Sequence, residues 1–302
     1  MTLQSGSRLG RYEVDGLIAS GGMGDVYRGH DTRLDREVAL KVLAPGVDPE
    51  RLTRFTQEAR TTALINHPNI VAVYDVGSED GLPFVVSELL HGQTLRMRMT
   101  AGPLQARVAV GYALEIANGL TAAHHLGVVH RDLKPENVFV TDSGRLKILD
   151  FGLAKCKTDK LGLPDDSSKS TQPGVILGTV GYMSPEQVRG GTIDERTDIF
   201  SVGVMLHEML AGRAPFERET PVETLYSILK DEAPPLGGRR DVAEELEHVV
   251  RHCLEKSPNA RFQSARDLAF VLDFTLRTMS EAPPPPRRPN RRGVFDVLMS
   301  LM

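Results

Sequence analysis

The stretch HRDLKPENVFV, at residues 130–140, places six strongly hydrated side chains within eight residues and then runs into apolar chain. A second acidic motif, LDFG, follows it and places Asp150 thirteen residues after Asn137. A solvated surface loop can have the first composition, but it is rarely followed by the second motif at this distance. The spacing therefore indicates that the side chains of Asp132, Asn137 and Asp150 bind a shared ligand. The apolar residues on either side would keep their backbone in place.

A glycine-rich stretch, IASGGMGDVY, places Gly21, Gly22 and Gly24 between two predicted strands. Glycine permits a close approach of the backbone, so the amide N–H groups of such a turn can lie over phosphates. A flexible hairpin explains the glycines equally well, and the form Gly-x-x-x-x-Gly-Lys-Ser/Thr is absent. The glycines alone are therefore a weak signal.

Lys41 follows seventeen residues after Gly24, within the predicted strand VALK. A cation among apolar strand residues needs an anionic partner. Glu58 is the candidate, because it lies beside Phe55 and Ala59 on a predicted helix and should face the sheet. The alternative is that Lys41 and Glu58 are two unrelated charges on the surface. The order and distances of the four motifs together argue against coincidence.

The elements that must position these groups fall into two regions. Residues 11–90 alternate turns with strand-like runs, at residues 12–18, 25–31, 37–43 and 83–90. One helix interrupts them, with apolar residues at three- and four-residue steps: Leu52, Phe55, Ala59 and Ala63. This pattern predicts a small, mostly antiparallel sheet with a single helix.

From about residue 95 the apolar periodicity becomes helical. An apolar stripe runs through residues 108–123, and Gly127 ends it. Residues 199–210 are apolar nearly all round, which is typical of a helix buried on every side. Further helices are predicted at 222–231, 242–255 and 264–278. The second region is therefore predicted to be mainly α-helical, which makes the chain α+β.

Composition narrows the class of protein. With 302 residues, 40% of them hydrophobic and 25% charged, the chain is an ordinary globular protein. The net charge is −4, and because the chain from Arg277 onward carries +3, the remainder carries −7. That balance gives no support to nucleic-acid binding. Two cysteines, Cys156 and Cys253, cannot form a disulfide framework.

No targeting segment is recognisable in the sequence. The N-terminus lacks the apolar core of a secretory signal. No apolar run approaches the roughly 18 residues that suggest a membrane span. We therefore expect a cytoplasmic protein.

In these four motifs the chain resembles the eukaryotic-type (Hanks-type) protein kinases. GGMGDVY and SPEQ make it most similar to the bacterial serine/threonine kinases, over residues 11 to about 275. The resemblance implies a bilobal α+β protein-kinase fold, with a small antiparallel sheet lobe carrying one helix and a larger, mostly α-helical lobe. It implies an N-terminal extension at 1–10, a kinase domain at 11–278 divided into lobes 11–90 and 91–278, and a Pro/Arg-rich tail at 279–302.

The same resemblance implies transfer of the γ-phosphate of ATP to Ser/Thr hydroxyls of proteins, and it assigns roles to the motif residues. Lys41, paired with Glu58, would bind the α- and β-phosphates. Asp132 would orient the acceptor hydroxyl and accept its proton, and Lys134 would contact the transferring phosphate. The implied ligands of Mg²⁺, or of Mn²⁺ in its place, are Asn137 and Asp150.

The nucleotide pocket is implied in the same way. Val26 and Ala39 would cover one face of the adenine and Phe139 the other, while the backbone of Glu88 and Leu90 would meet its edge. As ordinary core residues, Val26, Ala39 and Phe139 need no such role. The implied phosphate loop comprises Ile18, Ala19, Ser20, Gly21, Gly22, Met23 and Gly24.

In the larger lobe, GTVGYMSPEQ resembles the end of an activation segment, and Glu186 in it would pair with Arg261. Asp198 resembles the residue that braces the catalytic loop, with a helix N-cap as the plain alternative. His124 and His125 fit a helix end better than a pair of metal ligands.

The segment LPDDSSKSTQPG between the two acidic motifs is polar, so it can be merely a mobile loop. An arginine at position 131 can also bind a phosphate on this loop and order it. We therefore hypothesise that Thr171, or Ser170 beside it, is an activating autophosphorylation site. Homodimerisation would allow autophosphorylation between two copies. Thr179 in GTVGY resembles the serine/threonine-specific version of the family.

The chain departs from the family pattern at Ala19, which replaces the first glycine of the phosphate loop. If that position needs positive φ, alanine costs roughly 1–2 kcal/mol, whereas an extended conformation costs little. The C-terminal segment carries an apolar helical face that can dock or remain a frayed end, which we favour: Val294, Val297, Leu298 and Leu301.

Two alternative functions remain open. An ATP-binding pseudokinase scaffold would bind without turnover, but every group that the chemistry needs is present. A small-molecule kinase of related fold is the other alternative, and GTVGYMSPE argues against it because that segment resembles a peptide-docking platform.

Overall fold

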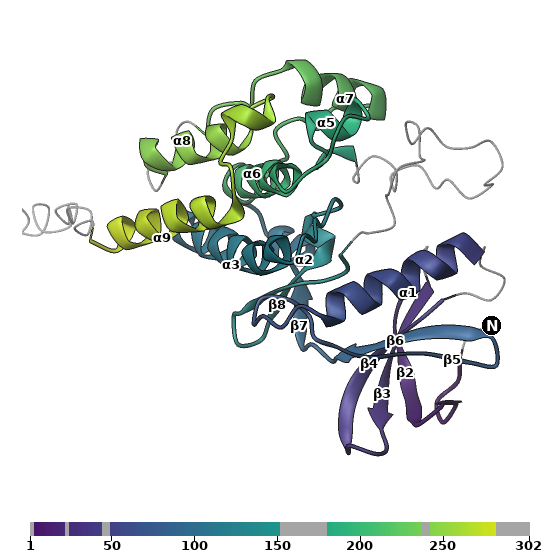
Figure 1. The fold of residues 1–302 in the computed structure, drawn as a ribbon. Coiled ribbons are helices and arrows are strands. Elements are labelled where there is room, and N and C mark those ends of the chain that lie inside the picture. Colours follow the sequence, from purple (N-terminus) through teal and green to yellow (C-terminus); the bar gives the residue numbers. More distant parts are fainter. Residues whose placement is uncertain (1–2, 22–23, 44–48, 152–179, 237–241, 282–302) are drawn as a thin grey trace, which may run out of the picture.

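The computed structural model describes residues 3–21, 24–43, 49–151, 180–236 and 242–281. They form a β-sheet lobe and a larger helical lobe (Figure 1). This arrangement confirms the predicted α+β, bilobal architecture. Over the described ranges, no helix combines the length and apolarity needed to cross a bilayer.

A six-stranded antiparallel sheet, in the order β1-β2-β3-β4-β6-β5, forms the first lobe. Its strands are β1 Arg8–Leu9, β2 Tyr12–Gly21, β3 Gly24–Asp31, β4 Arg36–Val42, β5 Val73–Glu79 and β6 Leu82–Glu88. Successive side chains of a strand point to opposite faces. In β4, Val38, Leu40 and Val42 are therefore buried in the core on one face of the sheet, and Lys41 lies on the other face.

Helix α1 (Pro49–Ala63) lies against that other face, where Phe55 and Ala59 pack on Leu43 and Val85 (Figure 1). The helix predicted from the spacing of Leu52, Phe55, Ala59 and Ala63 is thus present, but Leu52 is 37% exposed and Ala63 is exposed as well. A straight helix meets a twisted sheet over a short length. The outer positions of the stripe therefore project beyond the contact.

The second lobe comprises β7 Gly92–Thr94, α2 Leu95–Met99, α3 Ala106–His125, the 3-10 helix η1 Pro135–Asn137, β8 Val138–Thr141, β9 Leu146–Ile148, α5 Pro185–Val188, α6 Arg196–Ala211, α7 Pro221–Lys230, α8 Glu244–Cys253, the 3-10 helix η3 Pro258–Ala260 and α9 Ala265–Glu281. Strands β7, β8 and β9 form a small antiparallel sheet. The helices predicted at 222–231, 242–255 and 264–278 correspond to α7, α8 and α9, with ends that differ by at most three residues.

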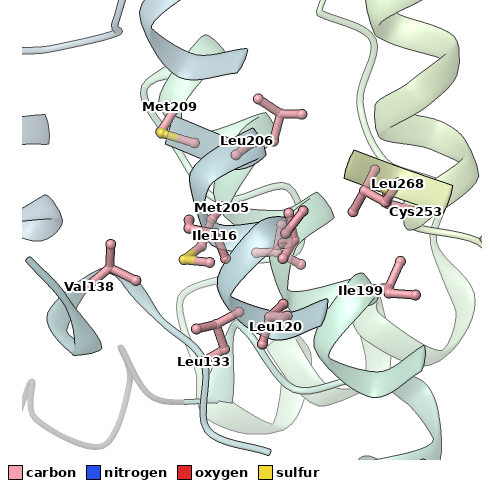
Figure 2. Packing of buried hydrophobic residues seen from close by; sticks show 14 of the residues in the cluster. Ile116, Leu120, Leu133, Val138, Ile199, Met205, Leu206, Met209, Cys253 and Leu268 are labelled. Carbon is pink, nitrogen blue, oxygen red and sulfur yellow. The ribbon is translucent and has the colours of Figure 1, made fainter. Parts of the chain in front are cut away.

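Helix α6 is the centre of this lobe, and it is buried on every side as predicted, from Thr197 to Leu210. Figure 2 shows Ile116 and Leu120 of α3 packed in the same core. Gly203 lets α6 approach α8, because a Cβ on it would lie 2.5 Å from the Cβ of Cys253. This core fixes the C-terminal end of α3 and the N-terminal end of α6. The polar loop at residues 130–137 lies beside these two ends.

Candidate active site

The loop that carries the HRDLKPEN motif alternates buried anchors with polar groups. His130, Leu133 and Pro135 are buried. Asp132 and Lys134, which lie between these anchors, are only half-buried. The buried residues pin the backbone to the core, so the polar side chains are held at the surface of a rigid support.

Within this loop, Lys134 Nζ forms an ion pair with Asp132 Oδ2 at 2.9 Å. The Asn137 side-chain amide donates from Nδ2 to the carbonyl oxygen of Asp132 at 2.9 Å. Since that nitrogen is committed to the loop, the amide oxygen Oδ1 is the atom of Asn137 that remains to bind a cation. The structure therefore brings Asp132, Lys134 and Asn137 together, as the resemblance implies.

Asp150 lies next to this loop. The backbone N–H of Leu149 donates to the carbonyl oxygen of Asn137 at 2.8 Å. The Asp150 carboxylate in turn accepts from Lys41 Nζ at 2.7 Å, with side-chain exposures of 56% and 22%. This contact joins strand β4 of the sheet lobe to the segment after β9. The two acidic motifs and the strand lysine thus form one continuous polar site.

Two residues of the site have left-handed backbone conformations, Arg131 with φ +66° and Asp150 with φ +31°. Such conformations cost of order 1–3 kcal/mol for residues other than glycine and persist only where the surroundings hold them. Arg131 is held on both sides of its Cα. Its N–H donates to Asp198 Oδ1 at 2.9 Å, and its carbonyl oxygen accepts from Gln187 Nε2 at 2.7 Å.

Asp198 is the brace of the loop. Its fully buried carboxylate accepts the N–H groups of His130 and Arg131, and His124 Nε2 contacts its Oδ2 at 2.8 Å. The N-cap residue of α6 is Glu195, so the capping alternative does not apply. His124 does lie in the last turn of α3 as expected, but its contact with Asp198 was missed. Nothing in the local sequence pattern signals a partner 74 residues away.

Ser184 and Glu186 attach the chain after residue 180 to the lobe. Ser184 caps α5 through a capping box with Gln187. Glu186 forms the predicted ion pair with Arg261, with both oxygens at 2.8 Å from the guanidinium. Burial raises the pKa of Glu186, but the hydrogen bonds and charge of Arg261 outweigh burial and hold that pKa below its ordinary value.

On the nucleotide side, Val26, Lys41 and Ala39 share one face of the sheet. Val26 pairs with Lys41 across the β3–β4 ladder, and Ala39 pairs with Ser87 across the β4–β6 ladder. Phe139 is half-buried on β8, and Leu90 follows β6. These positions place the implied adenine-binding residues on both lobes.

Glu88, at the end of β6, has a structural partner that was not predicted. Its Oε1 accepts from Lys147 Nζ at 2.6 Å and from the N–H of Ala72 at 2.7 Å. The side chain therefore ties the sheet lobe to β9. The contact of the Glu88 backbone with the edge of the adenine stays a prediction.

The phosphate loop is described in part. Ile18, Ala19, Ser20 and Gly21 lie in β2, where Ala19 pairs with Val26 in an extended conformation without positive φ. The strain considered for alanine at this position is therefore absent. At Gly24, φ is +132° and an added Cβ would lie 2.1 Å from the carbonyl oxygen of Val42, so only glycine fits.

Several predicted residues lie outside what the structure describes. These are Gly22 and Met23 of the phosphate loop, the side chain of Glu58, and Ser170, Thr171 and Thr179. The pairing of Lys41 with Glu58 therefore stays a prediction.

The donor atoms suit a hard cation. Over the described part of the chain there is no group of three or more His, Cys, Asp or Glu side chains that could hold a metal. A metal at this site would instead rest on the Asp150 carboxylate and the Asn137 amide oxygen, completed by ligand oxygens. Mg²⁺ prefers oxygen ligands and usually keeps waters and phosphate oxygens in its shell, so the residues fit it.

Comparison with known proteins gives consistent matches. The family model of the protein kinase domain matches residues 12–269. The serine/threonine-protein kinase PknB of Mycolicibacterium smegmatis is 39% identical over 266 residues, covering 85% of this chain and 42% of that protein. PknL of Mycobacterium tuberculosis is 41% identical over 267 residues, covering 87% and 65%. PknB of Mycobacterium leprae is 37% identical over 282 residues, covering 91% and 44%. The chain thus spans less than two thirds of the length of these relatives.

Proposed function

The chain belongs to the protein kinase domain family, and from this premise we propose that it transfers the γ-phosphate of ATP to serine and threonine hydroxyls of proteins. The matched relatives PknB and PknL are named serine/threonine-protein kinases. The observation that carries the proposal is the 2.7 Å contact between Lys41 and Asp150, beside the loop that holds Asp132. It joins a phosphate-binding cation from one lobe to a metal-binding carboxylate from the other.

In the proposed reaction, Asp132 orients the acceptor hydroxyl and takes its proton as the new O–P bond forms and ADP leaves. A positioned base of this kind contributes about 10²–10⁴-fold. Lys134, which forms an ion pair with Asp132, contacts the phosphoryl group during its transfer. Lys41 binds the α- and β-phosphates, with Glu58 as its expected partner. Most of the rate then comes from positioning and charge neutralisation.

Asn137 and Asp150 are the residues that would hold Mg²⁺ or Mn²⁺. When bound, the metal neutralises charge on the phosphate oxygens. Asp150 suits this task because its carboxylate is half exposed and can exchange Lys41 for a metal.

The nucleotide would lie across the two lobes. Val26 and Ala39 cover one face of the adenine and Phe139 the other, and the backbone of Glu88 and Leu90 meets its edge. The phosphates lie under the loop at residues 18–24. We keep the domain limits at 11–90 and 91–278, with the tail at 279–302.

Activation by autophosphorylation is the regulatory part of the proposal. Arg131, next to the base, would bind a phosphate on Thr171 or Ser170. A variant with both Thr171→Ala and Ser170→Ala should phosphorylate substrate more slowly than wild type. An unchanged rate would contradict this mode of activation.

The direct test is incubation of the full chain with γ-labelled ATP, Mg²⁺ and a generic basic protein, with Asp132→Asn as the matched control. We expect phosphoserine and phosphothreonine on the acceptor with wild type, and about 10²–10⁴-fold less with the variant. Phosphopeptide mapping of the kinase itself then locates its own sites. ATP binding without any transfer, in Mg²⁺ or Mn²⁺, would instead identify a pseudokinase scaffold.

A further inference from the structure

A second cluster of charged residues lies beside the catalytic loop and has no part in the chemistry described above. Arg96 of α2 donates from Nε to Glu136 Oε1 at 2.7 Å and from Nη1 to Glu208 Oε1 at 2.6 Å. Its Nη2 donates to the hydroxyl of Tyr182, which in turn donates to Glu208 Oε2. We call these four residues the Arg96 cluster.

Burial makes this cluster dependent on its cation. Glu208 and Tyr182 are buried, whereas Arg96 and Glu136 are partly exposed. A buried carboxylate such as Glu208 needs a cationic partner, and the guanidinium supplies it. Burial and the Glu208 charge raise the pKa of Tyr182. Burial lowers the pKa of Arg96, but Tyr182 and Glu208 outweigh it and raise that pKa overall. Arg96 therefore stays protonated and the Tyr182 hydroxyl stays neutral across the physiological range.

The three partners of Arg96 come from three separate parts of the lobe. Glu136 belongs to the catalytic loop, between Lys134 and Asn137. Tyr182 belongs to residues 180–184, which lead into α5, and Glu208 belongs to the central helix α6. A planar guanidinium with fixed donors can satisfy three acceptors at once, which an ammonium group cannot do with the same geometry.

This cluster links the catalytic loop to residues 180–188. A second link is the hydrogen bond from Gln187 Nε2 to the carbonyl oxygen of Arg131. The two attachment points on the loop, Arg131 and Glu136, lie on either side of Asp132. Residues 180–188 are thus fixed to the loop both before and after its catalytic carboxylate.

We propose that Arg96 is a positioning residue that holds residues 180–184 against the catalytic loop and thereby sets where the protein acceptor meets Asp132. The inference rests on the proposed kinase function. The nucleotide-binding groups Lys41 and Asp150 join the two lobes, whereas the Arg96 cluster joins only elements of the helical lobe. Its loss should therefore disturb the acceptor and leave the nucleotide in place.

The test compares two phosphoryl acceptors in the same protein. Transfer to a peptide requires the acceptor to be positioned, whereas slow hydrolysis of ATP without peptide uses water and reports the nucleotide site alone. Arg96→Ala should lower kcat/KM for the peptide about 10–100-fold, mainly through KM, as expected of a displaced acceptor. The rate of ATP hydrolysis and KM for ATP should stay within about 2-fold of wild type, a much smaller change than the loss expected for transfer to the peptide.

Two further variants sharpen the test. Arg96→Lys keeps the charge but not the fork of donors, so it should recover part of the peptide activity. Arg98→Ala is the matched control on the same helix, since Arg98 has no ion pair or side-chain hydrogen bond with the described residues. It should behave as wild type. Tyr182→Phe, which removes one hydroxyl, covers the case in which Arg96→Ala fails to fold.

Equal losses of hydrolysis and transfer in Arg96→Lys and Tyr182→Phe would overturn the inference, because a merely structural role lowers both. Unchanged peptide kinetics in Arg96→Ala would overturn it as well. A wild-type protein without transfer would overturn the proposed function and this inference together.

Discussion

The charged groups of the candidate active site and the charged groups that hold it in place differ in their exposure to water. Lys41, Asp132, Lys134 and Asp150 are between 18% and 56% exposed in their side chains, and they pair with one another. Asp198 is fully buried, and the Glu186–Arg261 pair is 9% and 0% exposed. The active groups can exchange partners with a ligand because water still reaches them. The supporting groups are fixed because each lost partner would leave a buried charge.

The largest expected effect separates the two sets by activity. Asp132→Asn should lower phosphate transfer by about 10²–10⁴-fold, while the free energy of unfolding stays within about 0.5 kcal/mol, as for a surface change. Initial rates with labelled ATP and urea denaturation measure the two quantities. A parallel loss of stability would place Asp132 among the supporting groups and break the comparison.

The buried Glu186–Arg261 pair should show the opposite behaviour. Arg261→Met leaves the Glu186 carboxylate buried without its cation, which costs about 3–5 kcal/mol of unfolding free energy. The double variant Glu186→Leu, Arg261→Met removes both charges and should recover most of that loss. Urea denaturation at pH 7 gives the values. If the double variant were as unstable as the single one, lost packing rather than an unpaired charge would be responsible.

The Asp198 brace connects the two sets, so it should affect stability and activity together. In Asp198→Asn, the amide nitrogen faces a backbone N–H, which leaves one donor of His130 or Arg131 unsatisfied at about 1–3 kcal/mol. The loop should also lose rate, since it carries Asp132. His124→Gln leaves both backbone hydrogen bonds to Asp198 intact and should cost less in both measurements. Wild-type kinetics in a destabilised Asp198→Asn protein would show that the brace does not position the loop.

The difference between the two sets also explains what the sequence could predict. Chemistry restricts the residue types and spacing of an active site, so Asp132, Asn137 and Asp150 were recognisable from their motifs. Supporting contacts need only a partner of suitable charge from anywhere in the fold. Arg96, His124 and their partners therefore carry no local signal, because these contacts span 40 to 112 residues.

The fold shows the same division. Helix α6 was predictable because it is apolar all round, and the strands of the sheet alternate clearly. Strand β5 was missed because its sequence, VYDVGSE, is largely polar and half-exposed. Leu52 shares the predicted helical periodicity but is exposed, because periodicity gives the direction of a helical side chain and not the length of the contact that covers it. Pattern thus predicts elements, and packing decides which of their residues are buried.

Lys256 is a partly exposed residue whose ammonium nitrogen is buried, and it gives the smallest predicted effect. Its Nζ lies 3.8 Å from the ring centre of Phe216 and has no hydrogen-bond partner among the described residues. Burial lowers the pKa of Lys256 from 10.5 to about 8, although the Asp231 carboxylate raises it in part. The unfolded chain then binds more protons than the folded protein between pH 8 and 10.5. Stability contributed by this group should therefore rise with pH across that window.

Because Lys256 is partly exposed, screening reduces the expected gain to about 1 kcal/mol. Lys256→Met keeps the apolar stem over Phe216 and removes the charge, so it should abolish the rise and exceed wild type in stability at pH 7. Urea denaturation of both proteins at pH 7, 8 and 9.5 isolates Lys256, since other titrating groups are common to both. The buried thiol of Cys253, with its pKa raised by burial to about 12, stays protonated throughout. Parallel curves for the two proteins would mean that the aromatic ring stabilises the ammonium as well as water does, so that even this charge has an adequate partner.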